Sequence, residues 1–198
     1  MKNRRSFITG LKSTVLHSIE IRFLKKYKPW GVILFSRNIK SIEQTKKLTD
    51  DIKKIFNDKK YPILIDQEGG RINRLSKFID TSKFTGEFFG NLYKNNFKKF
   101  VTYYKIYIIQ TCYLMHILGV NINTVPVLDV RNKKSHNIIG DRAFSTNPKI
   151  VSKIGDFCIK EFHKNNIGTV VKHIPGQGLA KVDSHKATPL VKAKLKKL

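Results

Sequence analysis

The sequence has few cysteines, few acidic residues and no long apolar run. Its 198 residues include only two cysteines, Cys112 and Cys158, which are too far apart to form a CxxC metal or redox motif. No stretch of about 18 apolar residues occurs, so a transmembrane helix is not predicted. Residues 1–16 lack the apolar run of a secretory signal peptide. We therefore expect a cytoplasmic protein in which both thiols are buried.

The shortage of acidic residues leaves a large positive charge. The 39 Lys and Arg residues against 14 Asp and Glu residues give a formal net charge of +25 at pH 7. This charge is compatible with binding to nucleic acid or an anionic membrane surface, and also with a simple bias in composition. We favour bias, because most of the basic residues are lysines scattered along the solvent sides of the expected helices. No helix-turn-helix pattern or aromatic stacking platform occurs, so no specific nucleic-acid partner is predicted.

Short apolar runs alternate along the chain with helical patterns. Ser41 is a candidate helix N-cap, and Gln44 three residues later would complete a capping box. A long helical stretch ends near Leu118, where Gly119 fits a C-terminal cap. Asn147 precedes another helix, which begins with a proline. The alternation predicts parallel α/β architecture, with strands expected over residues 6–9, 31–36, 61–66, 120–127 and 168–173.

The length limits how much of an α/β barrel these residues can form. A complete eight-stranded α/β barrel contains about 250 residues, whereas this chain has 198 and no low-complexity linker. We therefore expect a single domain of four or five β/α units. Residues 191–198 have the pattern of a further amphipathic element.

Polar residues follow the expected strands, where parallel α/β proteins hold their chemistry. Asp66 and Glu68 precede a Gly-Gly pair and Arg71. Their carboxylates are suited to accept hydrogen bonds from sugar hydroxyls, and the alternative is a turn held by a salt bridge to Arg71. Asp129 follows the next strand, as either a ligand or a buried capping group. We favour a structural role for Asp129.

Two further candidate residues are cationic, one in the loop that follows Asp129 and one at the end of the last strand. Arg142 presents a planar fork of donors that suits hydroxyls or a carboxylate, and the alternative is a loop-stabilising pair with Asp141. Lys172 ends a buried strand, where an ammonium group is costly without an acceptor. Its alternative role is an internal salt bridge to Asp129 or Asp66.

The segment 171–185 places Lys172, His173, Asp183 and His185 on one glycine-containing loop. An Asp two residues from a His can orient the imidazole and raise its pKa, so that the His acts first as acid and then as base. Taken alone this spacing is a weak motif, because a single His is more often structural.

Taken together, these segments resemble a known family. The chain contains ILFSRN, DQEGGRINRL, PVLDV, GDRAF, KHIPGQG and VDSHKATPL in that order, between about residues 7 and 190. In this it is similar to the glycoside hydrolase family 3 β-N-acetylhexosaminidases, bacterial enzymes of peptidoglycan recycling. The resemblance implies a TIM-type (β/α)8 barrel, here truncated to about five β/α units, so that residues 1–198 form a single incomplete N-terminal barrel domain. It also implies a cytoplasmic, retaining glycosidase that removes terminal non-reducing N-acetylglucosamine from peptidoglycan fragments without a metal or cofactor.

The resemblance also implies roles for individual residues. Asp66 and Arg74 would bind the sugar, and Arg142, Lys172 and His173 would hold its hydroxyl and N-acetyl groups. His185 would be the general acid/base, oriented by Asp183.

Two departures from the family pattern bear on activity. The family has a His where this chain has Gln177. Its nucleophile is an Asp on a later strand, beyond Leu198, and a retaining mechanism needs such a carboxylate. The resemblance therefore leaves open an alternative to the active enzyme. The chain would then be an inactive remnant, or one half of a split glycosidase that a C-terminal fragment complements.

Overall fold

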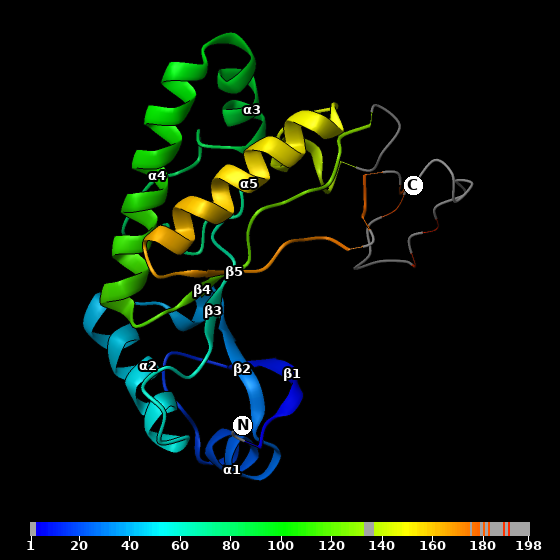
Figure 1. The fold of residues 1–198 in the computed structure, drawn as a ribbon. Coiled ribbons are helices and arrows are strands. Elements are labelled where there is room, and N and C mark those ends of the chain that lie inside the picture. Colours follow the sequence, from blue (N-terminus) through cyan, green and yellow to red (C-terminus); the bar gives the residue numbers. More distant parts are fainter. Residues whose placement is uncertain are drawn as a thin grey trace.

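Five parallel strands form one sheet in the order β1-β2-β3-β4-β5 (Figure 1). The computed structural model describes residues 3–132, 137–174, 176–178, 180, 182, 188 and 190. The strands are β1 (Arg5–Gly10), β2 (Pro29–Leu34), β3 (Ile63–Ile65), β4 (Ile122–Asn123) and β5 (Gly168–Thr169). The helices are α1 (Ser18–Tyr27), α2 (Ile42–Ile55), α3 (Gly86–Asn95), α4 (Phe97–Leu118) and α5 (Pro148–Lys164), with short 3-10 turns η1 (Ser36–Asn38) and η2 (Gly140–Arg142).

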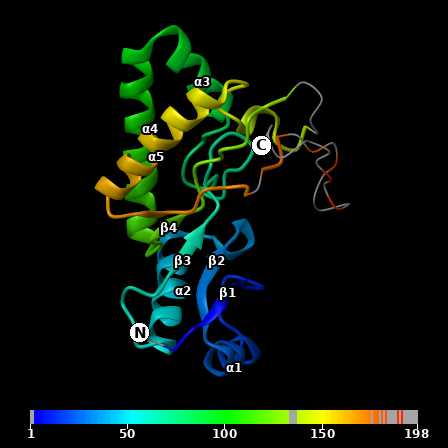
Figure 2. The ribbon, with the colours of Figure 1, turned by 45° about the vertical axis from the view of Figure 1, so that its right-hand side comes forward.

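Each strand pairs in parallel with the next strand in the chain. Val32 lies opposite Ile63, Leu64 lies opposite Ile122, and Ile122 lies opposite Gly168. Helices separate successive strands, and α1 contacts α2, α2 contacts α4, and α4 contacts α5. Figures 1 and 2 show α2, α4 and α5 following one another along the sheet. This is the strand and helix order of a (β/α)8 barrel, and the predicted α/β class is confirmed.

The start of α2 agrees with the sequence prediction in part. The Ser41 hydroxyl accepts a hydrogen bond from the Gln44 backbone N–H at 3.2 Å, as an N-cap does. The Gln44 side chain does not return to Ser41, however. Its Oε1 accepts from the Lys40 N–H at 2.8 Å, so the expected capping box is replaced by a contact one residue earlier. The apolar face of α2 buries Leu48 and Ile52.

The long helical stretch predicted before Gly119 consists of two helices. Asn96 separates α3 from α4, and its side chain accepts from the Lys99 N–H at 2.9 Å. Gly119 ends α4 as predicted, with a φ of +74° that suits glycine. Asn147 caps α5 by accepting from the Lys149 N–H at 2.9 Å, which confirms the predicted helix start.

Two strands are much shorter than predicted. The expected strand over 120–127 is β4 with only two residues, and the one over 168–173 is β5 with two. Pro126 has no N–H to give to a ladder, and the regular pairing stops before it. Pairing returns for a single bridge between Val127 and Lys172. The chain segments beyond the strands still lie side by side, which carries their polar residues to a common region.

The core lies between the sheet and the helices and contains both cysteines. Cys112 on α4 and Cys158 on α5 are free and buried, as predicted. Burial raises the pKa of each thiol to about 12, so both remain protonated at neutral pH. Tyr104 and Phe89, with ring centroids 4.3 Å apart, join α4 to α3.

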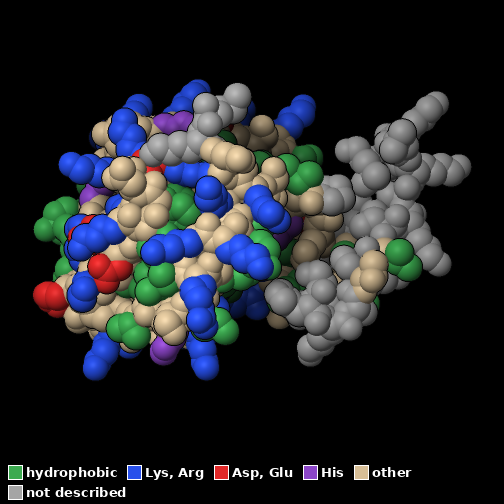
Figure 3. All heavy atoms as spheres, turned by 90° about the horizontal axis from the view of Figure 1, so that it is seen from below, with side chains coloured by type: hydrophobic (Ala, Val, Ile, Leu, Met, Phe, Trp, Pro, Cys, Tyr) green, Lys and Arg blue, Asp and Glu red, His purple; other side chains and the backbone are tan. Residues whose placement is uncertain are grey.

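Lys and Arg side chains are scattered over the face seen from below, among hydrophobic and other polar groups (Figure 3). Part of the positive charge lies in the last turns of helices: Lys25 and Lys26 on α1, Lys53 and Lys54 on α2, and Lys164 on α5. Cations at helix C-termini interact favourably with the helix dipole. This gives these five lysines a local structural role.

Candidate functional site

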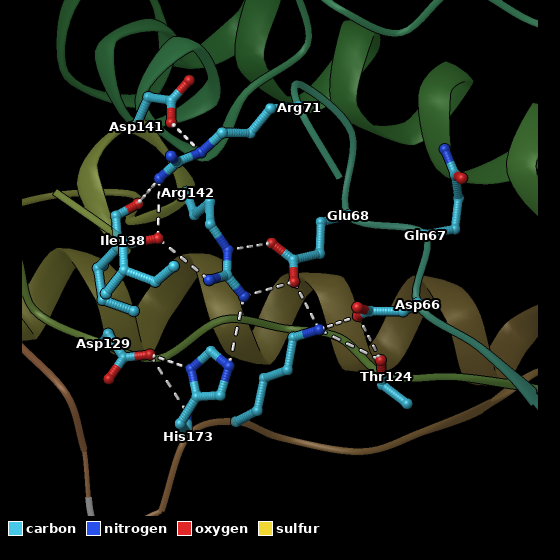
Figure 4. Close-up of polar contacts among 12 residues, drawn as sticks. Asp66, Gln67, Glu68, Arg71, Thr124, Asp129, Ile138, Asp141, Arg142 and His173 are labelled. Atoms are coloured by element: carbon cyan, nitrogen blue, oxygen red, sulfur yellow. Dashed lines mark hydrogen bonds and ion pairs between the residues drawn. The ribbon is translucent and has the colours of Figure 1, made fainter. Parts of the chain in front are cut away.

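The loops that follow β3, β4 and β5 meet η2 in one polar cluster (Figure 4). Of the residues predicted to bind sugar, the structure brings together Asp66, Arg74, Arg142, Lys172 and His173. Asp183 and His185, the predicted acid/base pair, lie outside the described residues.

Lys172 lies between two carboxylates. Its Nζ forms an ion pair with Asp66 and another with Glu68, the latter at 2.5 Å. The Thr124 hydroxyl donates to Asp66 Oδ1 at 2.8 Å and lies 3.2 Å from Lys172 Nζ. These acceptors stabilise an ammonium group that is only 13% exposed. Of the two salt-bridge partners predicted for Lys172, Asp66 is confirmed, whereas Asp129 bonds elsewhere.

Glu68 is bound on both of its oxygen atoms. Arg142 Nε donates to Oε2 and Nη2 donates to Oε1, each at 2.8 Å, in the two-pronged geometry of a strong guanidinium–carboxylate pair. The predicted alternative for Arg142, a pair with Asp141, is wrong, because Asp141 pairs with Arg71 at 3.2 Å. Arg71 therefore holds the η2 loop and does not bridge the carboxylates that precede it. Glu68 supports the two cations, in contrast to the expectation that it faces a ligand.

Asp129 orients His173. Its Oδ2 lies 2.6 Å from His173 Nδ1, and its Oδ1 accepts from the Gln177 backbone N–H at 2.5 Å. Arg142 Nη2 lies 3.3 Å from His173 Nε2. The tautomer that satisfies both ring contacts carries its proton on Nδ1 and accepts at Nε2. The structural role predicted for Asp129 agrees with these contacts, and the contact of residue 177 uses its backbone N–H, which Gln and His share.

The pKa of two site carboxyls is held below its ordinary value. For Asp66, burial alone would raise the pKa, but the charge and hydrogen bond of Lys172, the Thr124 hydroxyl and the charge of Arg74 together lower it. For Asp129, burial again opposes ionisation, and hydrogen bonds from His173 and the Gln177 backbone outweigh it. Both groups are therefore carboxylates at neutral pH.

The site is close to electrically neutral, although the protein is strongly basic. With His173 counted as neutral, three acidic side chains are matched by three basic side chains. The carboxylates are Asp66, Glu68 and Asp129, and the cations are Arg74, Arg142 and Lys172. A site that binds an anion has unmatched positive charge, whereas this site presents matched donors and acceptors.

Side-chain exposure separates two groups of residues in the site. Asp129 and Glu68 are 0% and 6% exposed, so they contact other protein groups. Asp66, Arg74 and His173 are 19%, 25% and 28% exposed. The second group has polar atoms that a ligand can reach.

The sequence did not point to every residue of the cluster. Thr124 and Asn123 at the end of β4 bond to Asp66 and to the Gln67 backbone, respectively. Their place at the end of a strand was a usable signal, but hydroxyl and amide side chains are common there. Among the described residues, no group of three or more His, Cys, Asp or Glu is arranged to hold a metal ion. None of the described helices combines the length and hydropathy needed to cross a membrane.

Comparison with known proteins gives a consistent result. Residues 16–198 match the model of the glycosyl hydrolase family 3 N-terminal domain. The β-hexosaminidase of Hydrogenovibrio crunogenus is 34% identical over 182 residues, which cover 90% of this chain and 49% of that protein. β-Hexosaminidase A of Pseudoalteromonas piscicida is 33% identical over 173 residues, which cover 85% of this chain and 28% of that protein. The chain thus spans half or less of the length of these relatives.

Solved structures share the fold. NagZ from Neisseria gonorrhoeae, in complex with N-trifluoroacetyl-D-glucosamine, superposes with a TM-score of 0.88 at 26% identity, covering 98% of this chain and 57% of that one. A family 3 β-N-acetylglucosaminidase from a Paenibacillus species gives a TM-score of 0.80 at 25% identity, covering 96% of this chain and 36% of that one.

Proposed function

The chain belongs to glycosyl hydrolase family 3, and on that premise we propose that it acts in the hydrolysis of terminal, non-reducing N-acetylglucosamine from peptidoglycan fragments. The proposed reaction is that of a β-N-acetylhexosaminidase with retention at the anomeric carbon. We further infer a cytoplasmic setting, which the family resemblance implies.

The charge balance of the site is the observation that carries this proposal. A neutral sugar needs both donors and acceptors for its hydroxyls and no net charge, and the cluster around Lys172 supplies both. Asp66 Oδ2 accepts one hydrogen bond from Arg74 and has a lone pair for a second, and the Arg74 guanidinium supplies donors at the exposed side of the network. His173 Nε2 can exchange its 3.3 Å contact with Arg142 for a sugar hydroxyl. Binding of N-trifluoroacetyl-D-glucosamine by the Neisseria relative supports an N-acetylated sugar as the ligand.

We assign Asp66 and Arg74 to sugar hydroxyls, and Arg142, Lys172 and His173 to the hydroxyl and N-acetyl region. In the proposed reaction His185, oriented by Asp183, protonates the glycosidic oxygen while a carboxylate attacks the anomeric carbon. The leaving group departs with that proton, and a covalent glycosyl intermediate forms. His185 then removes a proton from water, which releases the sugar and restores the carboxylate.

The attacking carboxylate is a separate group from those in the cluster. Asp66, Glu68 and Asp129 are each engaged with cations or hydrogen-bond donors. A carboxylate held in this way is a poor nucleophile, because the neighbouring cations and donors stabilise its charge. The proposal therefore leaves these three residues to binding and orientation.

The test uses a chimera that joins these 198 residues to the C-terminal part of the Hydrogenovibrio crunogenus β-hexosaminidase. The substrates are p-nitrophenyl N-acetyl-β-D-glucosaminide and, as a control, p-nitrophenyl β-D-glucoside. We expect hydrolysis of the first only, and its loss in the His185→Ala variant. A folded chimera that leaves the N-acetylglucosaminide intact contradicts the proposal, as does activity that His185→Ala does not change.

A further inference from the structure

Gln67 lies between two site carboxylates but its side chain points away from them (Figure 4). Asp66 and Glu68 extend toward Lys172, whereas Gln67 is only 1% exposed and faces the interior. We propose that Gln67 and Asn123 are positioning residues, which together fix Asp66, Glu68 and Arg74 in the geometry that binds the sugar. This inference rests on the proposed function, since it names the residues that hold that same site in place.

Asn123 holds the backbone of Gln67 on both sides. The Gln67 N–H donates to Asn123 Oδ1 at 3.0 Å, and Asn123 Nδ2 donates to the Gln67 carbonyl at 2.9 Å. Asn123 is the last residue of β4 and is fully buried. Regular pairing between β3 and β4 ends where Ile65 meets Asn123. The Asn123 amide therefore extends the pairing by the residue that separates the two carboxylates.

The Gln67 side chain holds the far end of the same loop. Its Oε1 accepts from the backbone N–H groups of Arg74 at 2.9 Å and Leu75 at 3.1 Å. Leu75 is fully buried and its N–H also donates to Asn73 Oδ1 at 3.1 Å, so the loss of Gln67 Oε1 falls mainly on the Arg74 N–H. One oxygen atom thus anchors Arg74, whose guanidinium reaches back to Asp66 at 3.1 Å.

The contacts of Asn123 and of the Gln67 side chain control the relative positions of the site residues. Asp66 and Glu68 share Lys172, so a shift of the peptide between them alters both ion pairs at once. Displacements of about 1 Å in a binding or catalytic group can cost on the order of a hundredfold in rate. Gln67 and Asn123 are 1% and 0% exposed, so they act on the sugar only through the residues they hold.

The experiment compares two variants of Gln67 that differ in the acceptor. Gln67→Met has a similar volume but no oxygen, whereas Gln67→Glu keeps an oxygen at the acceptor position, and burial at this 1% exposed position favours its uncharged form, which has the shape of Gln. Two quantities are measured on the intact chain by NMR: hydrogen exchange of the Arg74 and Leu75 amides, and affinity for N-acetylglucosamine. Amides in α5 report whether the rest of the fold is intact.

We expect Gln67→Met to lose protection at the Arg74 amide, while the Leu75 amide keeps its bond to Asn73 Oδ1. We expect sugar binding to weaken by roughly tenfold or more and exchange of the α5 amides to stay unchanged. We expect Gln67→Glu to stay within about threefold of the wild type. Unchanged affinity in Gln67→Met overturns the inference, with or without a change in exchange. If Gln67→Met does not fold, the sugar affinity of Asn123→Asp is measured in its place, because this variant keeps Oδ1 and loses the Nδ2 donor. Weakened binding then supports the inference, and unchanged affinity overturns it. Failure of the wild type to bind sugar counts against the proposed function, and retained protection of the Arg74 amide in Gln67→Met then separately counts against the anchoring role.

Discussion

Replacement of Glu68 by Gln tests whether this carboxylate is the centre of the charged cluster. The substitution keeps the shape of the side chain and removes its charge. Both oxygens of Glu68 bind cations, Arg142 at 2.8 Å through two bonds and Lys172 at 2.5 Å. In the variant, an amide NH₂ group must face one of these donors. Two cations then have lost their shared counter-charge.

The expected cost follows from how enclosed the cluster is. Glu68, Arg142 and Lys172 are 6%, 10% and 13% exposed, so water compensates little for the lost charge. Removal of one partner from a buried ion pair costs about 3–5 kcal/mol. Allowing for partial solvation, we expect Glu68→Gln to lower the free energy of unfolding by about 3 kcal/mol. That is a large share of the roughly 5–15 kcal/mol typical of a domain.

A matched control is available in the same chain. Glu87 pairs with Arg131 at 2.5 Å, but these side chains are 45% and 39% exposed. We expect Glu87→Gln to cost less than about 1 kcal/mol, as exposed ion pairs do. The assay is urea denaturation followed by circular dichroism, with equal m-values required for the comparison. If Glu68→Gln costs no more than Glu87→Gln, the assignment of Glu68 as the central counter-charge is wrong.

Three further predictions follow from the site. The fold lowers the pKa values of Asp66 and Asp129, so the stability that these groups contribute is present above about pH 4 and is lost as the pH falls through the folded pKa. Asp66→Asn should therefore reduce the loss of unfolding free energy at acid pH, and an unchanged loss would contradict this. Gly69 has a φ of +96°, and an added Cβ would lie 2.3 Å from the Phe84 carbonyl oxygen, so Gly69→Ala should cost about 2 kcal/mol or more in urea denaturation. Arg142→Lys loses the two-pronged bond to Glu68 and should weaken N-acetylglucosamine binding by roughly tenfold. Equal affinity in a titration would refute the role of Arg142 in sugar binding.

Much of the fold could be predicted because its signals are local. Helix caps such as Asn147 and Gly119 depend on neighbouring residues, and their predictions are confirmed. Apolar runs, which are typical of buried parallel strands, located the four later strands, whereas β1 is mostly exposed and was expected only as a short segment before them. The strand ends were placed too far along in β4 and β5, because apolar residues continue past Pro126, where the ladder is interrupted.

Which residues form the site could be predicted better than which of them form ion pairs with one another. Parallel sheets place site residues at the C-terminal ends of their strands and in the loops that follow, and this rule groups Asp66 and Lys172 directly and Arg142 through the long loop after β4. It does not decide which charge meets which. Arg142 has Asp141 as its neighbour in sequence, yet bonds Glu68, 74 residues away. Which charged groups pair depends on how the loops pack in three dimensions, and the sequence pattern alone does not specify that packing.

The most direct test of the central claim is an NMR titration of the ¹⁵N-labelled chain with N-acetylglucosamine. The claim is that the neutral cluster around Lys172 binds this sugar. We predict shift changes that saturate at Arg74, Arg142 and His173 and that disappear in Lys172→Met, while the amides of α5 remain as in the wild type. Absence of shifts at these residues in a folded chain, or identical shifts in Lys172→Met, would contradict the claim.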